Sequence, residues 1–383
     1  MTSADDPSPR LHSESSSLLT SPAPTRAPDR PPRKAHSAHL VRVVADEPSG
    51  DYADLRRRVR AAGLLNRSYR YYVVLATLLS FGLVVLAAIL WLLPGIGDFV
   101  AVPLLTFLLV QIGMLAHDAG HNQIFDKPAR NRVVGFICMP LFLALSFEDW
   151  MRTHNTHHAH TNQIGEDPDI THPILVFTRE QAQARRGLAR RIVRFQAYLY
   201  PVIALGAAFS LRADAWTRVF RKLPGAGALR ELALISVGLA FWVAVPSLLF
   251  GLSRWLVIFA LAQVLIGPYL VWLFAPNHKG MPIVTGHRPS FLEHQVLTSR
   301  NVYGGPIFDV LYGGLNYQIE HHLFPNMPRN RLPACRTLVR RFCAEAGISY
   351  AEEGVLASYR TVLRQLDEIG RGGSAPALAL GTG

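Results

Sequence analysis

Long apolar segments without charge constrain this chain more than any other feature. Residues 71–93 carry no charged side chain. At about 1.5 Å per residue, a helix of that length crosses the roughly 30 Å hydrocarbon core of a bilayer. Three further segments of this kind are 99–116, 232–250 and 255–276. Because very short turns join them in pairs, we expect an all-α integral membrane protein whose four transmembrane helices form two hairpins.

Two weaker apolar segments are predicted not to cross the membrane. Residues 133–147 are too few for a span and suit a re-entrant or interfacial segment better. Residues 195–211 are flanked by Arg194 and Arg212 and contain Pro201. We therefore expect a long loop between the two hairpins.

The basic residues predict which way the chain faces. Of the 39 Lys and Arg residues, only Arg254 lies in the two short hairpin turns. Positive loops stay cytoplasmic, so both termini and the central loop should be cytoplasmic. Topology thus explains most of the net charge of +12, and we expect no nucleic-acid partner. Residues 1–50 are rich in Pro, Ser and Arg and predict a disordered arm, and residues 366–383 predict a loose tail.

Histidines cluster at the predicted cytoplasmic ends of these segments. The first group has spacing i, i+4, which places both imidazoles on one helical face. The second has spacing i, i+3, i+4, and the third is an adjacent pair whose rings point about 100° apart on a helix. One more histidine directly follows the fourth apolar segment. These residues are His117 and His121, then His154, His157 and His158, then His321 and His322, and finally His278.

So many histidines indicate two metal ions rather than one. Histidine is the commonest metal ligand in proteins, and nitrogen-rich sites suit Fe, Zn, Cu or Ni. Zinc has no redox chemistry and would indicate a hydrolase, whereas iron would indicate oxygen chemistry. The spacing alone leaves this choice open.

The groups resemble the three histidine boxes of the membrane fatty acid desaturases. They read HDAGH at 117–121, HNTHH at 154–158 and QIEHH at 318–322, and the resemblance extends over roughly residues 52–360. It implies a membrane desaturase domain over residues 51–365 and a histidine-rich di-iron site in a cytoplasmic helical cap. A third box that begins with Gln is typical of front-end desaturases and also occurs in bacterial acyl desaturases, for which a plasma membrane location is expected.

The resemblance also implies the chemistry and the ligands. Two irons, O2 and two electrons would introduce a cis double bond into a long acyl chain, with acyl-CoA of the stearoyl, oleoyl or linoleoyl type favoured over acyl-lipid. All eight histidines named above would be iron ligands. Residues expected to support them, or of uncertain role, are Asn277, Gln318, Asp118, Asp167, Asp169, Glu320 and His160.

The electrons are expected to come from another protein. The chain shows no HPGG haem motif, no GxGxxG fingerprint and no cysteine cluster for iron–sulfur. A ferredoxin or an NADPH-dependent flavin/iron–sulfur reductase would serve. His287 and His294 are interpreted as surface residues, and Trp150 as a packing residue.

Two alternative functions are weighed against desaturation. The same boxes also serve acyl hydroxylases and related di-iron membrane oxygenases, which product analysis distinguishes. A metal transporter or sensor would carry ionisable ligands within its spans. The four apolar segments contain no His, Asp, Glu, Lys or Arg, which argues against transport.

Overall fold

A computed structural model describes residues 52–286 and 289–378. The predicted disordered arm lies outside these ranges. The described chain is mainly helical and carries two small parallel strand pairs. Helix α16 (Val355–Gly370) reaches beyond the start of the predicted loose tail, and strand β4 (Ala377–Leu378) pairs with β1 (Ile283–Val284). The tail is therefore ordered further than expected, because Ile283 and Val284 give it a buried edge on which to pair.

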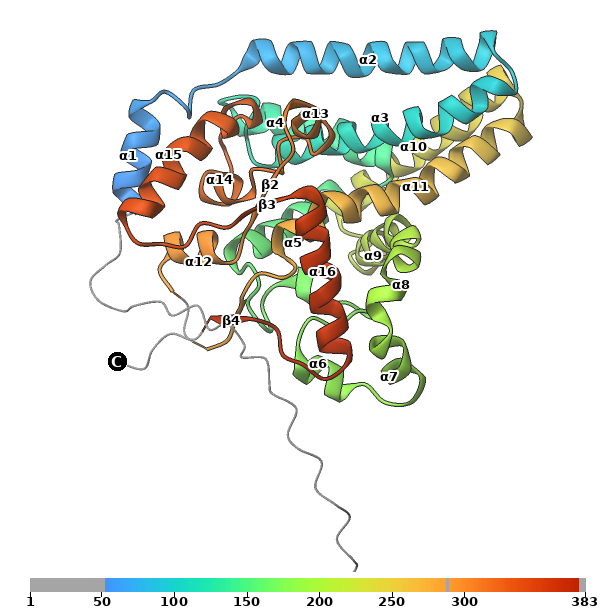
Figure 1. Ribbon diagram of the computed structural model, residues 1–383. Helices are drawn as coiled ribbons and strands as arrows, with labels where there is room; N and C mark the ends of the chain where they lie inside the picture. Colours follow the sequence, from blue (N-terminus) through green and yellow to red (C-terminus); the bar gives the residue numbers. More distant parts are fainter. Residues whose placement is uncertain (1–51, 287–288, 379–383) are drawn as a thin grey trace, which may run out of the picture. The chain divides into compact units, whose positions relative to one another are not determined.

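Four helices are long and apolar enough to cross a membrane, as the sequence predicts. They extend the predicted segments by two to six residues at most of their ends. Helix α2 packs along α3, α11 packs against both α3 and α10, and these contacts make one bundle (Figure 1). Their bounds are α2 (Tyr69–Leu92), α3 (Ile96–Gly120), α10 (Ala226–Phe250) and α11 (Leu252–His278).

Exposed apolar side chains show which helices face lipid. Only 17% of the most apolar stretch of α2 is buried, against 61% in α3. Phe81 on α2 and Leu248 on α10 are 63% and 87% exposed. Large apolar side chains gathered on an open face mark a surface that avoids water. Helices α2 and α10 therefore form the lipid side of the bundle, and α3 forms its interior.

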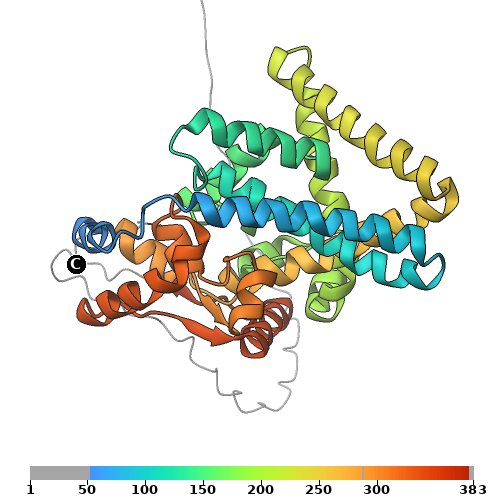
Figure 2. The same ribbon diagram turned by 90° about the horizontal axis from the view of Figure 1, so that it is seen from above.

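The turns that join the two helix pairs lie at the same end of the bundle (Figures 1 and 2). Arg254, at the start of α11, donates from Nε to Asp98 Oδ1 at 2.9 Å. Its guanidinium also donates to the Leu90 carbonyl oxygen at 2.9 Å. This half-buried ion pair joins the two turns. The histidine-bearing ends of α3 and α11 therefore lie together at the opposite end of the bundle.

The two weaker apolar segments form broken helices. Helix α4 (Pro128–Phe136) continues as the π-helix η1 (Ile137–Leu143), which contains Pro140. The chain then turns through 108° into α5 (Phe147–Ala159). The second segment divides into α8 (Gln196–Leu205) and α9 (Ala207–Arg221), and a ten-residue helix covers only about 15 Å. That these segments do not span stays a prediction, and their lengths and bends agree with it.

The remaining elements surround the ends of α3 and α11. Helix α14 carries the third histidine group and packs against α12, α15 and β2 (Figure 1). Strand β2 pairs in parallel with β3. The bounds are α1 (Tyr52–Ala61), η2 (Pro168–Ile170), α6 (Arg179–Ala184), α7 (Gly187–Arg194), α12 (Phe291–Leu297), β2 (Asn301–Tyr303), α13 (Pro306–Leu311), α14 (Gln318–Leu323), η3 (Arg329–Arg331), α15 (Leu332–Glu345) and β3 (Glu352–Gly354).

Candidate metal centre

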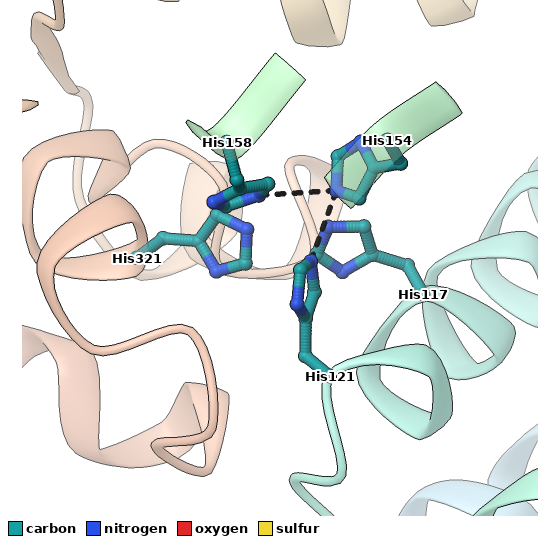
Figure 3. Close-up of side chains that lie close together, drawn as sticks. All are labelled: His117, His121, His154, His158 and His321. Carbon is teal, nitrogen blue, oxygen red and sulfur yellow. Dashed lines mark hydrogen bonds between the residues drawn. The ribbon is translucent and has the colours of Figure 1, made fainter. Parts of the chain in front are cut away.

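Three helices bring five imidazoles to one point (Figure 3). Each residue offers one nitrogen, and these nitrogens all lie within 4.8 Å of one another. His154 Nε2 is 3.0 Å from His121 Nε2 and 3.1 Å from His158 Nε2. The end of α3 provides His117 and His121, α5 provides His154 and His158, and α14 provides His321. We call these five residues the first group.

The second group lies directly beside the first. His157, His278 and His322 offer nitrogens within 4.8 Å of one another. The rings of His158 and His322 stack with centroids 4.1 Å apart, which links the two groups. His157 and His158 are neighbours on α5, as His321 and His322 are on α14, and the side chains of adjacent residues on a helix point about 100° apart. Both boxes therefore contribute to both groups, as two adjacent metal ions would require.

A glycine allows the first box to approach the second. Gly120 is the last residue of α3, one turn after His117. A Cβ atom there would lie 2.6 Å from the Trp150 ring and 2.7 Å from Met151 Sδ. Such contacts are far below van der Waals separation. The glycine in HDAGH therefore lets the end of α3 press against α5.

Oxygen acceptors orient each ring of the second group through Nδ1. His157 Nδ1 is 3.0 Å from Asp167 Oδ1, His278 Nδ1 is 3.1 Å from the Thr298 carbonyl oxygen, and His322 Nδ1 is 2.8 Å from Gln295 Oε1. Thr161 Oγ1 also lies 3.2 Å from His322 Nδ1. Donation from Nδ1 fixes the tautomer and leaves Nε2 as the metal-binding lone pair.

Buried ring nitrogens without partners test whether a metal fits. Among the histidines of the two groups, four buried ring nitrogens form no hydrogen bond within the described residues: His117 Nε2, His158 Nδ1, His321 Nε2 and His322 Nε2. A buried polar atom without a partner costs roughly 1–3 kcal/mol. Four such atoms in one site are costly unless a ligand binds them. The donor set consists of imidazoles, which suits iron and other late first-row metals.

Burial keeps most of these imidazoles neutral and ready to bind a cation. Burial, together with the neighbouring imidazoles, lowers the pKa of His154, His158, His321 and His322 well below 6.5. The pKa of His121 falls to about 3 for the same reasons. His157 differs: burial opposes its protonation, but the carboxylates of Asp169 and Asp167 raise its pKa.

Asp118 forms a buried ion pair with Arg329 next to the first group. Its carboxylate is 2.7 Å from Arg329 Nε, and both side chains are almost fully buried. His117 Nδ1 lies 3.6 Å from Asp118 Oδ1, which is too long for a hydrogen bond. Arg329 is therefore an interior residue whose guanidinium pairs with a buried carboxylate.

Gln318 and Asn277 form a short chain of hydrogen bonds to the second group. Asn277 Nδ2 donates to Gln318 Oε1 at 3.0 Å, and Gln318 Nε2 lies 2.9 Å from His278 Nε2. The amide that replaces the first histidine of the third box thus reaches the second group. Asn277 orients it while also donating to the Leu273 and Leu315 carbonyl oxygens.

Other predicted residues lie around the two groups. Asp169 Oδ2 is 3.5 Å from His157 Nδ1, and Asp169 is largely exposed. Glu320 is buried and accepts from Asn301 Nδ2 at 2.7 Å and from the Tyr350 hydroxyl at 2.8 Å. Burial raises its pKa to about 7. His160 belongs to neither group, and its Nδ1 lies 3.1 Å from Gln163 Oε1.

The interpretation of His294 as a surface residue is wrong. His294 is fully buried, and its Nε2 lies 2.7 Å from the Thr161 carbonyl oxygen. The Ser290–Glu293 capping box starts α12 at the point that turns His294 inward. His287 lies outside the described residues. Sequence reasoning also missed Thr161, Gln295 and Thr298, which lie between the motifs and carry no spacing pattern of their own.

An apolar cavity reaches the first group, and we call it the site cavity. His117 lines it, and so does Trp150, which was interpreted as a packing residue. Trp150 stacks on His154 with ring centroids 4.5 Å apart. The other lining residues are Leu109, Val110, Gly113, Met114, Met139, Leu143, Leu145, Ala208, Leu211, Arg212, Ile266, Leu270 and Phe274. This mainly apolar lining suits a hydrocarbon next to His117.

Curated relatives of this chain are desaturases. The "Acyl-lipid (9-3)-desaturase" of Physcomitrium patens is 28% identical over 334 residues, which are 83% of this chain and 62% of that protein. The chain thus spans less than two thirds of that relative. The "Delta(8)-fatty-acid desaturase" of Euglena gracilis is 29% identical over 352 residues, 85% of this chain and 81% of that protein.

A third relative has the same character, and the family profile agrees. The "Delta(6)-fatty-acid desaturase fat-3" of Caenorhabditis elegans is 29% identical over 352 residues, 86% of this chain and 77% of that protein. The profile described as "Fatty acid desaturase" matches residues 99–354, which contain every histidine of both groups. This chain therefore belongs to the fatty acid desaturase family, a family of oxidoreductases that act on lipids.

Proposed function

We propose that this protein is an O2-dependent fatty acyl desaturase that introduces a cis double bond into a long acyl chain. Its substrate is an acyl-CoA of the stearoyl, oleoyl or linoleoyl type or the corresponding acyl-lipid. One observation carries this proposal: two groups of buried, mainly neutral imidazoles lie side by side, and His117 of the first group lines an apolar cavity. The names of the relatives support the reaction class.

The first group of histidines would hold one iron, and the second group would hold another. When bound, the irons supply the oxidising chemistry by which O2 and two electrons remove two hydrogens from adjacent methylenes. Asp167, Gln295 and the Thr298 carbonyl hold three imidazoles in the tautomer that binds metal. The side-chain amide of Gln318 lies next to His278 and would border the second iron.

The chain's apolar residues would position the substrate and exclude water. Trp150 covers His154, and Ile266, Leu270 and Phe274 line one side of the site cavity. Such walls hold a methylene near the first group and keep water from the oxidant. Electrons would come from a separate protein, a ferredoxin or a flavin/iron–sulfur reductase, and the active site would face the cytoplasm of a bacterial-type cell.

Expression in a desaturase-deficient host tests the proposal. We expect new unsaturated acyl chains whose double bond mass spectrometry locates, and we expect purified protein to hold about two irons per chain. The His157→Ala variant, expressed to the same level in membranes, is the inactive control. Hydroxylated products would support the alternative of an acyl hydroxylase. Zinc in place of iron, with no activity after reconstitution with ferrous iron, would contradict the proposal.

A further inference from the structure

Four arginines line a cavity between α7 and the end of α16, and we call it the arginine cavity. Helix α7 contacts α16 (Figure 1). Gly370, the last residue of α16, approaches α7 so closely that a Cβ atom there would lie 2.5 Å from the Val193 carbonyl oxygen. The cavity has a volume of about 380 Å³. Its lining contains no histidine of either group and consists of Arg190, Arg191, Arg194, Gly370 and Arg371.

The arginine cavity carries an excess of positive charge. Arg371 Nε pairs with Asp367 Oδ2 at 2.9 Å. Arg190 Nη1 donates to the Ala182 carbonyl oxygen at 2.7 Å, and this contact brings no negative charge. Within residues 52–286 and 289–378, no carboxylate lies within ion-pair distance of the three arginines on α7. Cations gathered in this way repel one another, so the cavity favours an anion.

Helix α8 follows these arginines directly and exposes a row of large apolar side chains. They stand at positions i, i+3, i+7 and i+10, which lie on one face of a helix. Tyr198 and Val202 are 68% and 63% exposed. We call this row the apolar stripe, and its residues are Phe195, Tyr198, Val202 and Leu205.

The apolar stripe reaches the depth of the transmembrane bundle. A Cβ atom on Gly267 of α11 would lie 2.1 Å from the Ala204 carbonyl oxygen, so the end of α8 presses against α11 at that point. Gly267 lies 11 residues before His278, the last residue of α11, which is about 16 Å along the helix. Helix α8 therefore leads from the arginine cavity into the apolar layer that the four long helices define.

We propose that the arginine cavity binds the phosphate group of an anionic phospholipid whose acyl chains lie along the apolar stripe. Guanidinium groups bind phosphate oxygens through paired hydrogen bonds. Basic residues beside an exposed apolar face are also the composition of a segment that lies in the membrane interface. A soluble acidic protein could meet the arginines, but it could not follow the stripe to the depth of Gly267. This inference goes beyond the proposed desaturation and does not depend on it.

The first experiment measures lipid retention by the full-length protein. Detergent-solubilised protein is mixed with phosphatidylcholine and increasing phosphatidylglycerol, and native mass spectrometry counts the bound lipids. Replacing two arginines, in the double variant Arg191→Gln with Arg194→Gln, should raise the phosphatidylglycerol concentration at half-saturation roughly 25-fold, because each contributes about fivefold. The matched control is Arg360→Gln with Arg364→Gln, which removes the same charge from exposed positions on α16 outside the cavity lining. It should bind as the wild type does.

Inorganic phosphate separates a lipid site from a site for a free anion. At concentrations equal to that of the lipid, it should leave the bound phosphatidylglycerol in place, because it makes no contact with the apolar stripe. Complete displacement would mean that the arginines bind a free anion only, which would overturn the proposal. Equal retention of phosphatidylglycerol by the wild type and by the Arg191→Gln, Arg194→Gln variant would overturn it too. Monodisperse elution of each variant in gel filtration shows that a loss of binding is not a loss of folding.

The second experiment measures the depth of the apolar stripe in vesicles of phosphatidylcholine and phosphatidylglycerol. A spin label on Val202→Cys should be accessible to dissolved oxygen and shielded from a water-soluble nickel chelate. The same label on Gln183→Cys, an exposed position on α6, is the control and should be accessible to the chelate. The native cysteines are buried, so labelling should be specific. Free access of the chelate to position 202 would mean that the stripe faces water and is open to a protein partner, which would also overturn the proposal.

Discussion

Single ring nitrogens decide what this site can hold. His157, His278 and His322 each direct Nδ1 to an oxygen, and these oxygens come from a side-chain carboxylate, a backbone carbonyl and an amide. Different chemical groups thus produce the same orientation of three rings. A packing role alone does not require this agreement, whereas a metal ion that binds three Nε2 atoms does.

His278 is the residue whose role most needs a direct test, because it lies 40 residues before the third box. A cation at the end of a helix gains only roughly 0.3–1 kcal/mol from the helix dipole, so a capping role predicts little effect of His278→Ala. If His278 is a ligand, the His278→Ala variant should lose activity by about 100-fold or more. Its activity should then be as low as that of His157→Ala, and its iron content should fall. Activity and bound iron are measured on membranes with matched expression.

His160→Ala is the control for this comparison. It lies in the same region of the chain and belongs to neither group. It should keep both iron and activity. Near-normal turnover in His278→Ala beside an inactive His157→Ala would remove His278 from the ligand set and leave seven box histidines.

At the scale of helices, the sequence predicts those features that a local pattern of charge or spacing determines. An uncharged run such as residues 71–93 predicts a long helix because no charge interrupts it, and the structure confirms four such helices. The spacing of His154, His157 and His158 predicts that one helix presents all three to the site, and the structure adds that His157 faces the second group while the other two face the first. His294 was misplaced, and the burial of Arg329 could not be predicted, because both depend on residues distant in sequence, Thr161 and Asp118 respectively. No local period encodes such contacts.

The Asp98–Arg254 ion pair bears on how the helices cross the membrane. It joins the two short turns, so the chain between α3 and α10 must begin and end at the opposite end of the bundle. An extra crossing by the bent pair of α4 with η1 and α5 would break this arrangement. The structure therefore agrees with four crossings and with a central segment that returns to the side it came from.

Cysteine labelling in intact cells tests this topology. Ile96→Cys and Ser253→Cys should react with an impermeant thiol reagent added outside, and Gln183→Cys should react only after the cells are opened. All three positions are exposed, and the native cysteines Cys138, Cys335 and Cys343 are buried, so background labelling should be low. If only one of Ile96→Cys and Ser253→Cys reacted from outside, the two turns would lie on opposite sides of the membrane. The segment between α3 and α10 would then cross the membrane an odd number of times.

For the whole molecule, the site joins elements that are far apart in the sequence. The first group connects His117 on α3 to His321 on α14, and the second connects α5 to α11 through His157 and His278. Without metal, the orphaned nitrogens and the closely facing imidazoles disfavour this arrangement. Metal binding should therefore stabilise α5, α14 and the histidine-bearing ends of α3 and α11 together rather than one helix at a time.

Iron removal is expected to lower the thermal stability of the entire protein. A ligand that binds only the folded state at 1,000 times its Kd adds about 4 kcal/mol. Chelated protein should therefore unfold at a lower temperature in detergent, and reloading with ferrous iron should restore the midpoint. Hydrogen exchange should rise together in α5, in α14 and at the ends of α3 and α11, while the lipid-facing α2 stays protected. The His157→Ala variant should show little response to either treatment. An equal midpoint for loaded and stripped wild-type protein would mean that the histidines fold into place without a metal, and the two groups would then need another explanation.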